Sequence, residues 1–203
     1  PLGIAKFDIG PSPAEAHAHK TDHGCTGASV SASHPRRREM PKLKEISLEF
    51  QDKIVILTGA AGGIGTALAR EFAGRGARLA LCDLNAAALE ALAGELGALH
   101  MVCDVTVESH IQALVAEVEA RLGPVDIFFS NAGFSSGEPD HAASAPDRIW
   151  QASWEVHVMA HVYACRALLP AMRARGQGYL VQMASAAGLL NQIGDAAYST
   201  SKH

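Results

Sequence analysis

The chain has 203 residues, 48% of them hydrophobic, and a net charge of −4 at pH 7. This size and composition fit one α/β domain with a substantial core plus a tail, and they exclude a chain that is disordered throughout. The small negative charge gives no reason to expect nucleic acid or anionic lipid as a partner. The longest apolar runs, such as Ile54–Leu57, are too short to cross a bilayer, and no signal peptide is recognisable.

The four cysteines are scattered without paired spacing, at Cys25, Cys82, Cys103 and Cys165. In a chain of this kind, the pattern indicates free thiols in a reducing compartment rather than a disulfide framework. We therefore expect a cytoplasmic protein.

Residues 1–39 are rich in Pro, Ser, Gly and His and contain few large apolar residues, so we expect them to be disordered. The chain begins with Pro1, whereas Met40 stands directly before a coherent domain over residues 40–203. We hypothesise that Met40 is the native initiator and that the tail is not native. The tail's histidines and Arg36–Arg38 are assigned no function, and no metal site is predicted.

From Leu48 onward, predicted strands alternate with predicted helices. The expected strands are Lys53–Thr58, Arg78–Asp83, Leu99–Asp104, Val125–Ser130 and Tyr179–Ser185. Apolar residues at helical spacing predict the helices between them, the first over Ile64–Phe72, the second with Leu89, Leu92 and Leu96, and the third over Ile111–Leu122.

A loop over about Phe134–Asp147 precedes a long predicted helix, and Tyr198 is expected to begin the last helix. The apolar face assigned to the long helix comprises Trp150, Trp154, Val158, Cys165, Leu168 and Met172. Strict alternation with buried apolar strands predicts a doubly wound, Rossmann-like parallel sheet with helices on both faces.

A glycine-rich turn, Thr58–Gly65, follows the first strand and opens the first helix, with Gly59, Gly63 and Gly65 spaced as G-x-x-x-G-x-G. Glycines allow a phosphate to approach the backbone closely, and the helix N-terminus offers free N–H groups and partial positive charge. The alternative is a tight turn that needs glycine only for packing.

Asp83 ends the second strand, eighteen residues after Gly65, where a carboxylate can accept hydrogen bonds from ribose hydroxyls. The alternative role for Asp83 is a helix N-cap. A carboxylate there repels a 2′-phosphate, and Ala60 and Ala61 offer no cation, so NAD is favoured over NADP. Asp104 ends the third strand and Asn131-Ala132-Gly133 ends the fourth, which places all these groups at carboxyl ends of strands.

Tyr198 and Lys202 are four residues apart, so they share one face of a helix. An ammonium close to a phenol favours the phenolate, and such a phenol can act as base toward an alcohol or as acid toward a ketone. Ser185, thirteen residues before Tyr198, ends the fifth strand, where its hydroxyl can hold the substrate oxygen. The structural alternatives are an ordinary amphipathic pair and a serine in a turn.

In this order and spacing, the features resemble the short-chain dehydrogenase/reductase family over about Leu48–His203. The resemblance implies an NAD(P)-dependent oxidoreductase that interconverts a secondary alcohol and a ketone, with Tyr198 as general acid/base. It also implies that Lys202 binds the nicotinamide ribose. The cofactor-binding residues implied are Thr58, Gly59, Gly63, Ile64, Gly65, Asp83, Leu84, Asp104, Val105, Asn131, Ala132, Gly133, Tyr198 and Lys202.

The chain departs from the family pattern at His157, where the family usually places an asparagine that completes a catalytic tetrad with Ser185, Tyr198 and Lys202. We expect retained but weakened activity, and a His157→Asn change is expected to raise turnover. His157 and His161 also form an H-x-x-x-H pair, but zinc proteases carry glutamate at the position of Val158, so structural histidines are favoured.

The resemblance further implies that the family continues beyond Lys202 with two more strands, a Pro-Gly turn and a substrate lid. We therefore expect a fragment with an open fifth strand, little stability and no measurable turnover by itself. For the full-length protein, a homodimer or homotetramer acting on a small alcohol or carbonyl compound is expected. The alternative is a dinucleotide-binding protein of this fold that is catalytically impaired.

Overall fold

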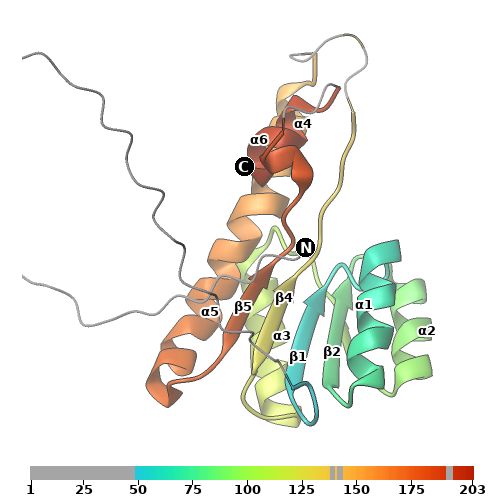
Figure 1. Ribbon diagram of the computed structural model, residues 1–203, viewed down its shortest axis with the longest axis vertical. Coiled ribbons are helices and arrows are strands. Elements are labelled where there is room, and N and C mark those ends of the chain that lie inside the picture. Colours follow the sequence, from blue (N-terminus) through green and yellow to red (C-terminus); the bar gives the residue numbers. More distant parts are fainter. Residues whose placement is uncertain (1–48, 138–139, 141–143, 191–193) are drawn as a thin grey trace, which may run out of the picture. The chain divides into compact units, whose positions relative to one another are not determined.

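The structure is a computed structural model in which residues 49–137, 140, 144–190 and 194–203 are described. The expected tail over residues 1–39 and the first residues of the expected domain lie outside this range. Within it, strands and helices alternate along the chain (Figure 1).

The first half of the described chain contains β1 (Ile54–Thr58), α1 (Gly63–Gly74), β2 (Arg78–Asp83), α2 (Ala86–Leu96), β3 (Leu99–Val102) and α3 (Glu108–Arg121). The second half contains β4 (Ile127–Ser130), α4 (Asp147–Trp154), the π-helix η1 (Glu155–Met159), α5 (Ala160–Arg175), β5 (Tyr179–Gln182), the 3₁₀-helix η2 (Ala186–Gly188) and α6 (Ala196–Lys202).

The five strands form one parallel sheet in the order β3-β2-β1-β4-β5. Central β1 pairs Ile54 with Arg78 on one side and Val55 with Ile127 on the other. The chain winds outward from β1 to β3 and then returns to the other side of β1 to form β4. This reversal creates a switch point at the carboxyl ends of β1 and β4, where open α/β sheets bind ligands.

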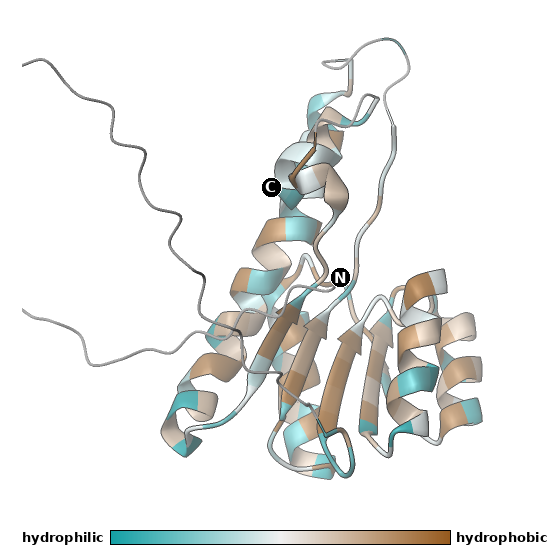
Figure 2. Ribbon diagram, in the orientation of Figure 1, coloured by the Kyte–Doolittle hydropathy of each residue, from teal (hydrophilic) through white to brown (hydrophobic). Residues whose placement is uncertain are grey.

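Helices cover both faces of the sheet because side chains alternate along each strand. On one face, Ile56 and Phe128 belong to a core that includes Leu114 of α3 and Leu168 of α5. On the other face, the ring of Phe129 lies 5.8 Å from that of Phe72 in α1, and α1 packs beside α2. The strands are accordingly hydrophobic along most of their length (Figure 2). The predicted doubly wound, Rossmann-like fold is confirmed.

The predicted strands are found in order, but β3, β4 and β5 are shorter than expected. The sequence assigned Cys103-Asp104 to β3 and residues 183–185 to β5, because their composition continues the strands. In the structure β3 ends at Val102 and β5 at Gln182, although the N–H groups of Cys103 and Met183 still donate to Asp83 and Ser130 of the neighbouring strands. The apolar pattern therefore overstates strand length where a site begins.

The predicted face of the long helix is partly wrong. Trp150 and Trp154 are 36% and 50% exposed, whereas His157 is fully buried. The cause is η1, which interrupts the helix with a wider turn and so rotates α4 relative to α5. The buried residues along α4, η1 and α5 are Ser153, His157, Ala160, Ala164, Leu168 and Met172.

Cys82, Cys103 and Cys165 are free thiols. Within the described part of the chain, no helix combines the length and apolar character that a membrane span requires.

Candidate active site

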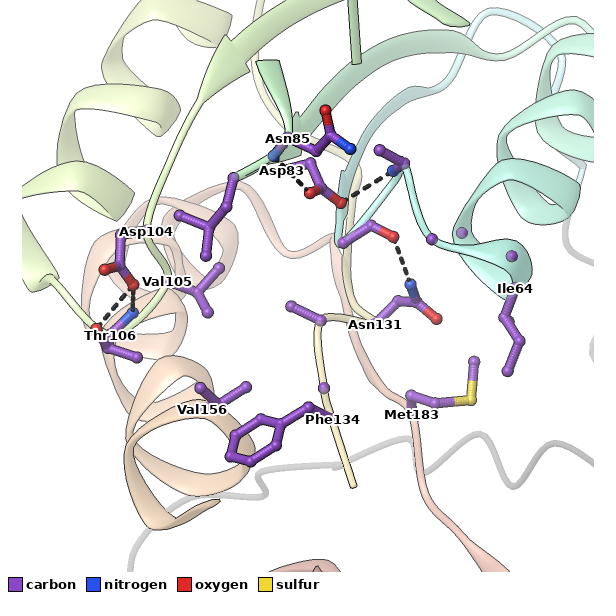
Figure 3. Close-up of a pocket in the computed structure, with 18 of the residues that line it drawn as sticks. Ile64, Asp83, Asn85, Asp104, Val105, Thr106, Asn131, Phe134, Val156 and Met183 are labelled. Atoms are coloured by element: carbon purple, nitrogen blue, oxygen red, sulfur yellow. Dashed lines mark hydrogen bonds between the residues drawn. The ribbon is translucent and has the colours of Figure 1, made fainter. Parts of the chain in front are cut away.

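A cavity of about 860 Å³ lies at the carboxyl edge of the sheet, over the switch point (Figure 3). Its walls come from the glycine-rich turn, the segments that follow β2, β3, β4 and β5, the π-helix η1 and helix α6. The residues predicted for the cofactor that line it are Gly59, Gly63, Ile64, Gly65, Asp83, Leu84, Asp104, Val105, Asn131, Ala132, Gly133, Tyr198 and Lys202. Thr58, which is 2% exposed, does not line it.

The glycines of the turn differ in what their missing side chains allow. Gly59 has φ 63°, and a Cβ on it would lie 2.7 Å from the Cα of Ala132. A Cβ on Gly65 would lie 2.0 Å from the carbonyl oxygen of Gly59. Packing therefore requires glycine at both positions. Gly63 lines the cavity, and no protein atom lies within 4 Å of the corresponding point.

The N-terminus of α1 also lines the cavity, at Gly63, Ile64 and Gly65. Its N-cap, Gly62, has no side chain, and its first turn contains no acidic residue. By contrast, Asn85 caps α2 and Asp195 caps α6 through their side chains. Free N–H groups and the positive end of the helix dipole favour an anionic group there. Together with the space at Gly63, this end of the cavity fits a pyrophosphate.

Asp83 lies at the end of β2 between two backbone donors. Its Oδ2 accepts the N–H of Ala61 at 3.0 Å, and its Oδ1 accepts the N–H of Asn85 at 2.9 Å (Figure 3). The alternative role as cap of α2 is wrong, because Asn85 is the cap and its Oδ1 accepts the N–H of Ala88 at 3.2 Å. The carboxylate instead holds the glycine-rich turn and lines the cavity.

Thr58 and Asn131 join the glycine-rich turn to the segment after β4. The Oγ1 of Thr58 accepts the N–H groups of Asn131 and Ala132 at 3.0 and 3.1 Å. The Nδ2 of Asn131 donates to the carbonyl of Gly59 at 3.1 Å. These bonds hold the glycine-rich turn against the segment after β4. Thr58 therefore supports the cavity wall without lining the cavity itself.

The far wall of the cavity contains Asp104 and several apolar side chains. Asp104 accepts hydrogen bonds from the N–H and hydroxyl of Thr106 at 2.9 and 2.7 Å. Val105, which also lines the cavity, is buried, whereas Leu84 is 67% exposed. Exposed apolar surface at the rim of a cavity is suited to covering a flat ring.

Tyr198 and Lys202 lie on α6 and both line the cavity. The Nζ of Lys202 donates to the carbonyl of Met183 at 3.0 Å and lies 5.9 Å from the centre of the Tyr198 ring. Burial lowers the pKa of Lys202. The predicted phenol and ammonium therefore stand close together in the lining of the cavity.

Among the described residues that line this cavity, Ser185 is absent. It caps η2, where its Oγ accepts the N–H of Ala187 at 3.2 Å. Its predicted contact with the substrate oxygen remains a prediction.

His157 is fully buried in η1 and bonded at both ring nitrogens. Its Nε2 accepts the N–H of Phe134 at 3.1 Å, and its Nδ1 lies 2.8 Å from the Oγ of Ser201. Burial, helped by the charge of Lys202, lowers the pKa of His157 to about 4, so the ring is neutral near pH 7. Because Nε2 is an acceptor, Nδ1 carries the proton and donates to Ser201.

Neither nitrogen of His157 is therefore free for zinc. Within the described ranges, no cluster of three or more His, Cys, Asp or Glu is placed to hold a metal ion. Burial likewise lowers the pKa of His161 to about 4.

Several residues of the site were not identified from the sequence. Cys103, Phe134, Ser135, Val156 and Met183 also line the cavity. Met183 and Cys103 directly follow β5 and β3, but the sequence analysis placed both inside the predicted strands, so this position was not recognised. Asp195, buried at 2% exposure, stands three residues before Tyr198 at the N-cap position, a spacing typical of helix starts.

Comparisons with known proteins place the chain among dehydrogenases. The family model for short chain dehydrogenases matches residues 53–203. D-threitol dehydrogenase from Mycolicibacterium smegmatis is 35% identical over 172 residues, which are 80% of this chain and 65% of that protein. A short chain dehydrogenase/reductase from Burkholderia phymatum, solved in complex with NAD, has a TM-score of 0.72 at 30% identity, covering 77% of this chain and 57% of that one. NAD⁺-bound xylitol dehydrogenase has a TM-score of 0.70 at 32% identity, with coverage of 76% and 61%.

The chain thus spans between half and about two thirds of the length of the relatives that it matches. The matched residues include the whole cavity lining, from the glycine-rich turn to α6. The chain belongs to the short chain dehydrogenase family.

Proposed function

We propose that the protein is an NAD-dependent oxidoreductase that interconverts a secondary alcohol and a ketone, with Tyr198 as general acid/base. One observation carries the proposal. The phenol and ammonium of Tyr198 and Lys202 line the same cavity as the uncapped start of α1 and the carboxylate of Asp83. A pair of side chains suited to proton transfer therefore lines the same cavity as the residues proposed to bind a dinucleotide.

The residues of the cavity suit the parts of the cofactor in order. The start of α1 at Gly63 would hold the pyrophosphate, Asp83 would accept the adenosine ribose hydroxyls, and Asp104 and Val105 would border adenine. When bound, the nicotinamide supplies the position that gives or takes a hydride. The protein's own share is then binding, orientation and proton transfer.

The charges of the lining favour NAD over NADP. Within the described lining, the charged side chains are Asp83, Asp104 and Lys202. Both carboxylates are assigned to the adenosine end of the proposed cofactor site, and Lys202, beside Tyr198, is assigned to the nicotinamide end. A 2′-phosphate beside Asp83 would meet like charge without a compensating cation.

Proton transfer is assigned to Tyr198. As a phenolate it takes the hydroxyl proton of an alcohol, and as a phenol it gives that proton to the oxygen of a ketone. Lys202 places its Nζ 5.9 Å from the centre of the Tyr198 ring. Ser185 lies two residues after Met183, which lines the cavity. We propose that its hydroxyl holds the substrate oxygen.

The substrate class is best sought among polyols and their ketones. The relatives described above are named for D-threitol and xylitol, which share neighbouring secondary hydroxyl groups. We propose polyols as the first class to assay, followed by simple secondary alcohols.

The proposal is tested by measuring turnover and cofactor binding in the natively expressed protein and its Tyr198→Phe variant. We expect faster turnover with NAD than with NADP, and a loss of about 100- to 10,000-fold in kcat for Tyr198→Phe, since general acid–base catalysis contributes that much. Affinity for NAD should change little, because the phenol hydroxyl is not needed to hold the pyrophosphate.

Tyr179→Phe, at the start of β5, is the matched control and should keep full turnover. Full turnover in Tyr198→Phe would contradict the assignment. NAD binding without any turnover in the unmodified protein would instead support the dinucleotide-binding alternative.

A further inference from the structure

Asp195 is a buried carboxylate that joins two segments far apart in the chain. It is 2% exposed and directly precedes α6. Its Oδ1 accepts the N–H of Tyr198 at 3.0 Å. Its Oδ2 accepts the hydroxyl of Ser135 at 2.5 Å and the N–H of Gly137 at 3.2 Å. A simple N-cap needs only the first of these bonds. The Oδ2 atom of Asp195 therefore bonds the segment that follows β4.

The charge of Asp195 is stabilised by these donors. Burial acts to raise the pKa of Asp195, but hydrogen bonds from Ser135 and from the N–H groups of Tyr198, Gly137 and Ser136 outweigh it and hold the pKa below its usual value. The carboxylate is thus ionised at neutral pH, and hydrogen bonds to an ionised acceptor are the stronger kind.

The same segment after β4 reaches α6 by a second route. The N–H of Phe134 donates to His157, whose Nδ1 donates to the Oγ of Ser201. The hydroxyl of Ser201 in turn donates to the carbonyl of Tyr198 at 3.0 Å. Ser201 therefore stands between the buried imidazole and the backbone of the proposed catalytic residue.

The two routes close into a ring, because Phe134 and Ser135 are neighbours in the chain. One route ends on the N–H of Tyr198 and the other on its carbonyl. Both backbone groups of this residue are thereby tied to the segment whose residues Phe134 and Ser135 form a wall of the cavity. The edge of the His157 ring also lies against the Tyr198 ring, with centroids 5.3 Å apart.

We propose that Asp195 is a positioning residue which, with His157, closes a ring of hydrogen bonds that fixes Tyr198 relative to the nicotinamide end of the cavity. The consequence for turnover rests on the proposed function, whereas the ring itself does not. A displacement of about 1 Å in a reacting group can cost about 100-fold in rate, so such a clamp has a measurable effect.

The test uses Asp195→Asn in the natively expressed protein. Asparagine caps helices as well as aspartate does, so the bond to Tyr198 can persist. With its oxygen on Tyr198, its amide nitrogen can accept from neither Ser135 nor Gly137, so both lose their charged acceptor and the Gly137 N–H loses its bond. We expect kcat to fall between about 10-fold and about 100-fold while the Kd for NAD and the substrate KM stay within about 3-fold.

A second readout does not depend on turnover. In Asp195→Asn, the amide hydrogen of Gly137 should exchange about 10-fold faster, because it loses an ionised acceptor. Protection unchanged at Gly137 would overturn the ring whether or not the protein is an enzyme. Absence of turnover in the unmodified protein would defeat the proposed function and leave this readout intact.

Ser135 supplies a double-mutant cycle. Ser135→Ala should lower kcat alone but add little in the Asp195→Asn background, and Ser135→Thr should preserve activity because it keeps the hydroxyl. Asp126→Asn is the matched control, since Asp126 also accepts a backbone N–H, that of Ile54 at 3.0 Å, at the other end of the sheet. It should lower stability and leave kcat unchanged. Equal losses of kcat in both aspartate variants, or additive effects in the cycle, would overturn the proposal.

Discussion

Gly59, Gly63 and Gly65 belong to one sequence motif, but they are needed for different physical reasons. At Gly65 a side chain would collide with the carbonyl of Gly59, so glycine is needed for the fold itself. At Gly63 no protein atom limits a side chain. Because Gly63 also lines the cavity, a bound ligand is the reason that the proposed function supplies for glycine there.

This difference makes a matched pair of variants informative. Gly65→Ala should destabilise the protein and weaken NAD binding together, because the Cβ would lie 2.0 Å from the Gly59 oxygen. Gly63→Ala should keep or raise stability, since alanine in a helix is favoured over glycine by about 0.5–1 kcal/mol, yet weaken NAD binding. Thermal unfolding and equilibrium NAD titration of both variants measure this. Unimpaired NAD binding by Gly63→Ala would contradict the assigned pyrophosphate position.

At the scale of elements, η1 decides which side of the long helix is buried and brings His157 beside α6. Apolar periodicity assigned Trp150 and Trp154 to the buried face because it assumed one regular helix. The π-turn cannot be read from that pattern, since it depends on the tertiary bonds of His157 to Phe134 and Ser201. The start of α6 was also placed late, because the cap at Asp195 was not recognised.

His157 should make stability depend on pH. Its pKa is lowered to about 4 in the folded chain, against about 6.5 when unfolded, so the unfolded chain binds more protons between these values. The free energy of unfolding therefore falls as pH drops from about 6.5 toward 4. Asparagine at 157 can replace Nδ1 but cannot reach Phe134, so His157→Asn is expected to be less stable at pH 7, with the difference shrinking as pH falls.

Urea unfolding of both proteins at several pH values between 7 and 4.5 gives this difference directly. A difference that does not change with pH would contradict a neutral, buried His157. His161 has its pKa lowered to a similar value and would keep part of the pH dependence in the variant. Because the ring at Tyr198 also opens, we now expect His157→Asn to lower turnover rather than raise it, which reverses the expectation drawn from the family pattern.

At the scale of the whole described chain, the sequence was sufficient for the fold because the alternation of apolar strands with amphipathic helices admits few parallel arrangements. The carboxyl ends of the strands share one edge, so the sequence alone predicts that Asp83, Asp104 and Asn131 lie together, and all three line the cavity. Their roles could not be assigned fully. Asn131 lines the cavity and also donates to the carbonyl of Gly59 in the glycine-rich turn, and the contacts of Asp195 with Ser135 join residues 60 positions apart.

The most direct test of the central claim is the structure of the natively expressed protein in complex with NAD. We expect the adenosine ribose at Asp83, the pyrophosphate at the start of α1 over Gly63, and the nicotinamide ring at the end of the cavity where Tyr198 and Lys202 stand. A dinucleotide bound outside this cavity, or bound with its nicotinamide directed away from Tyr198, would contradict the assignment.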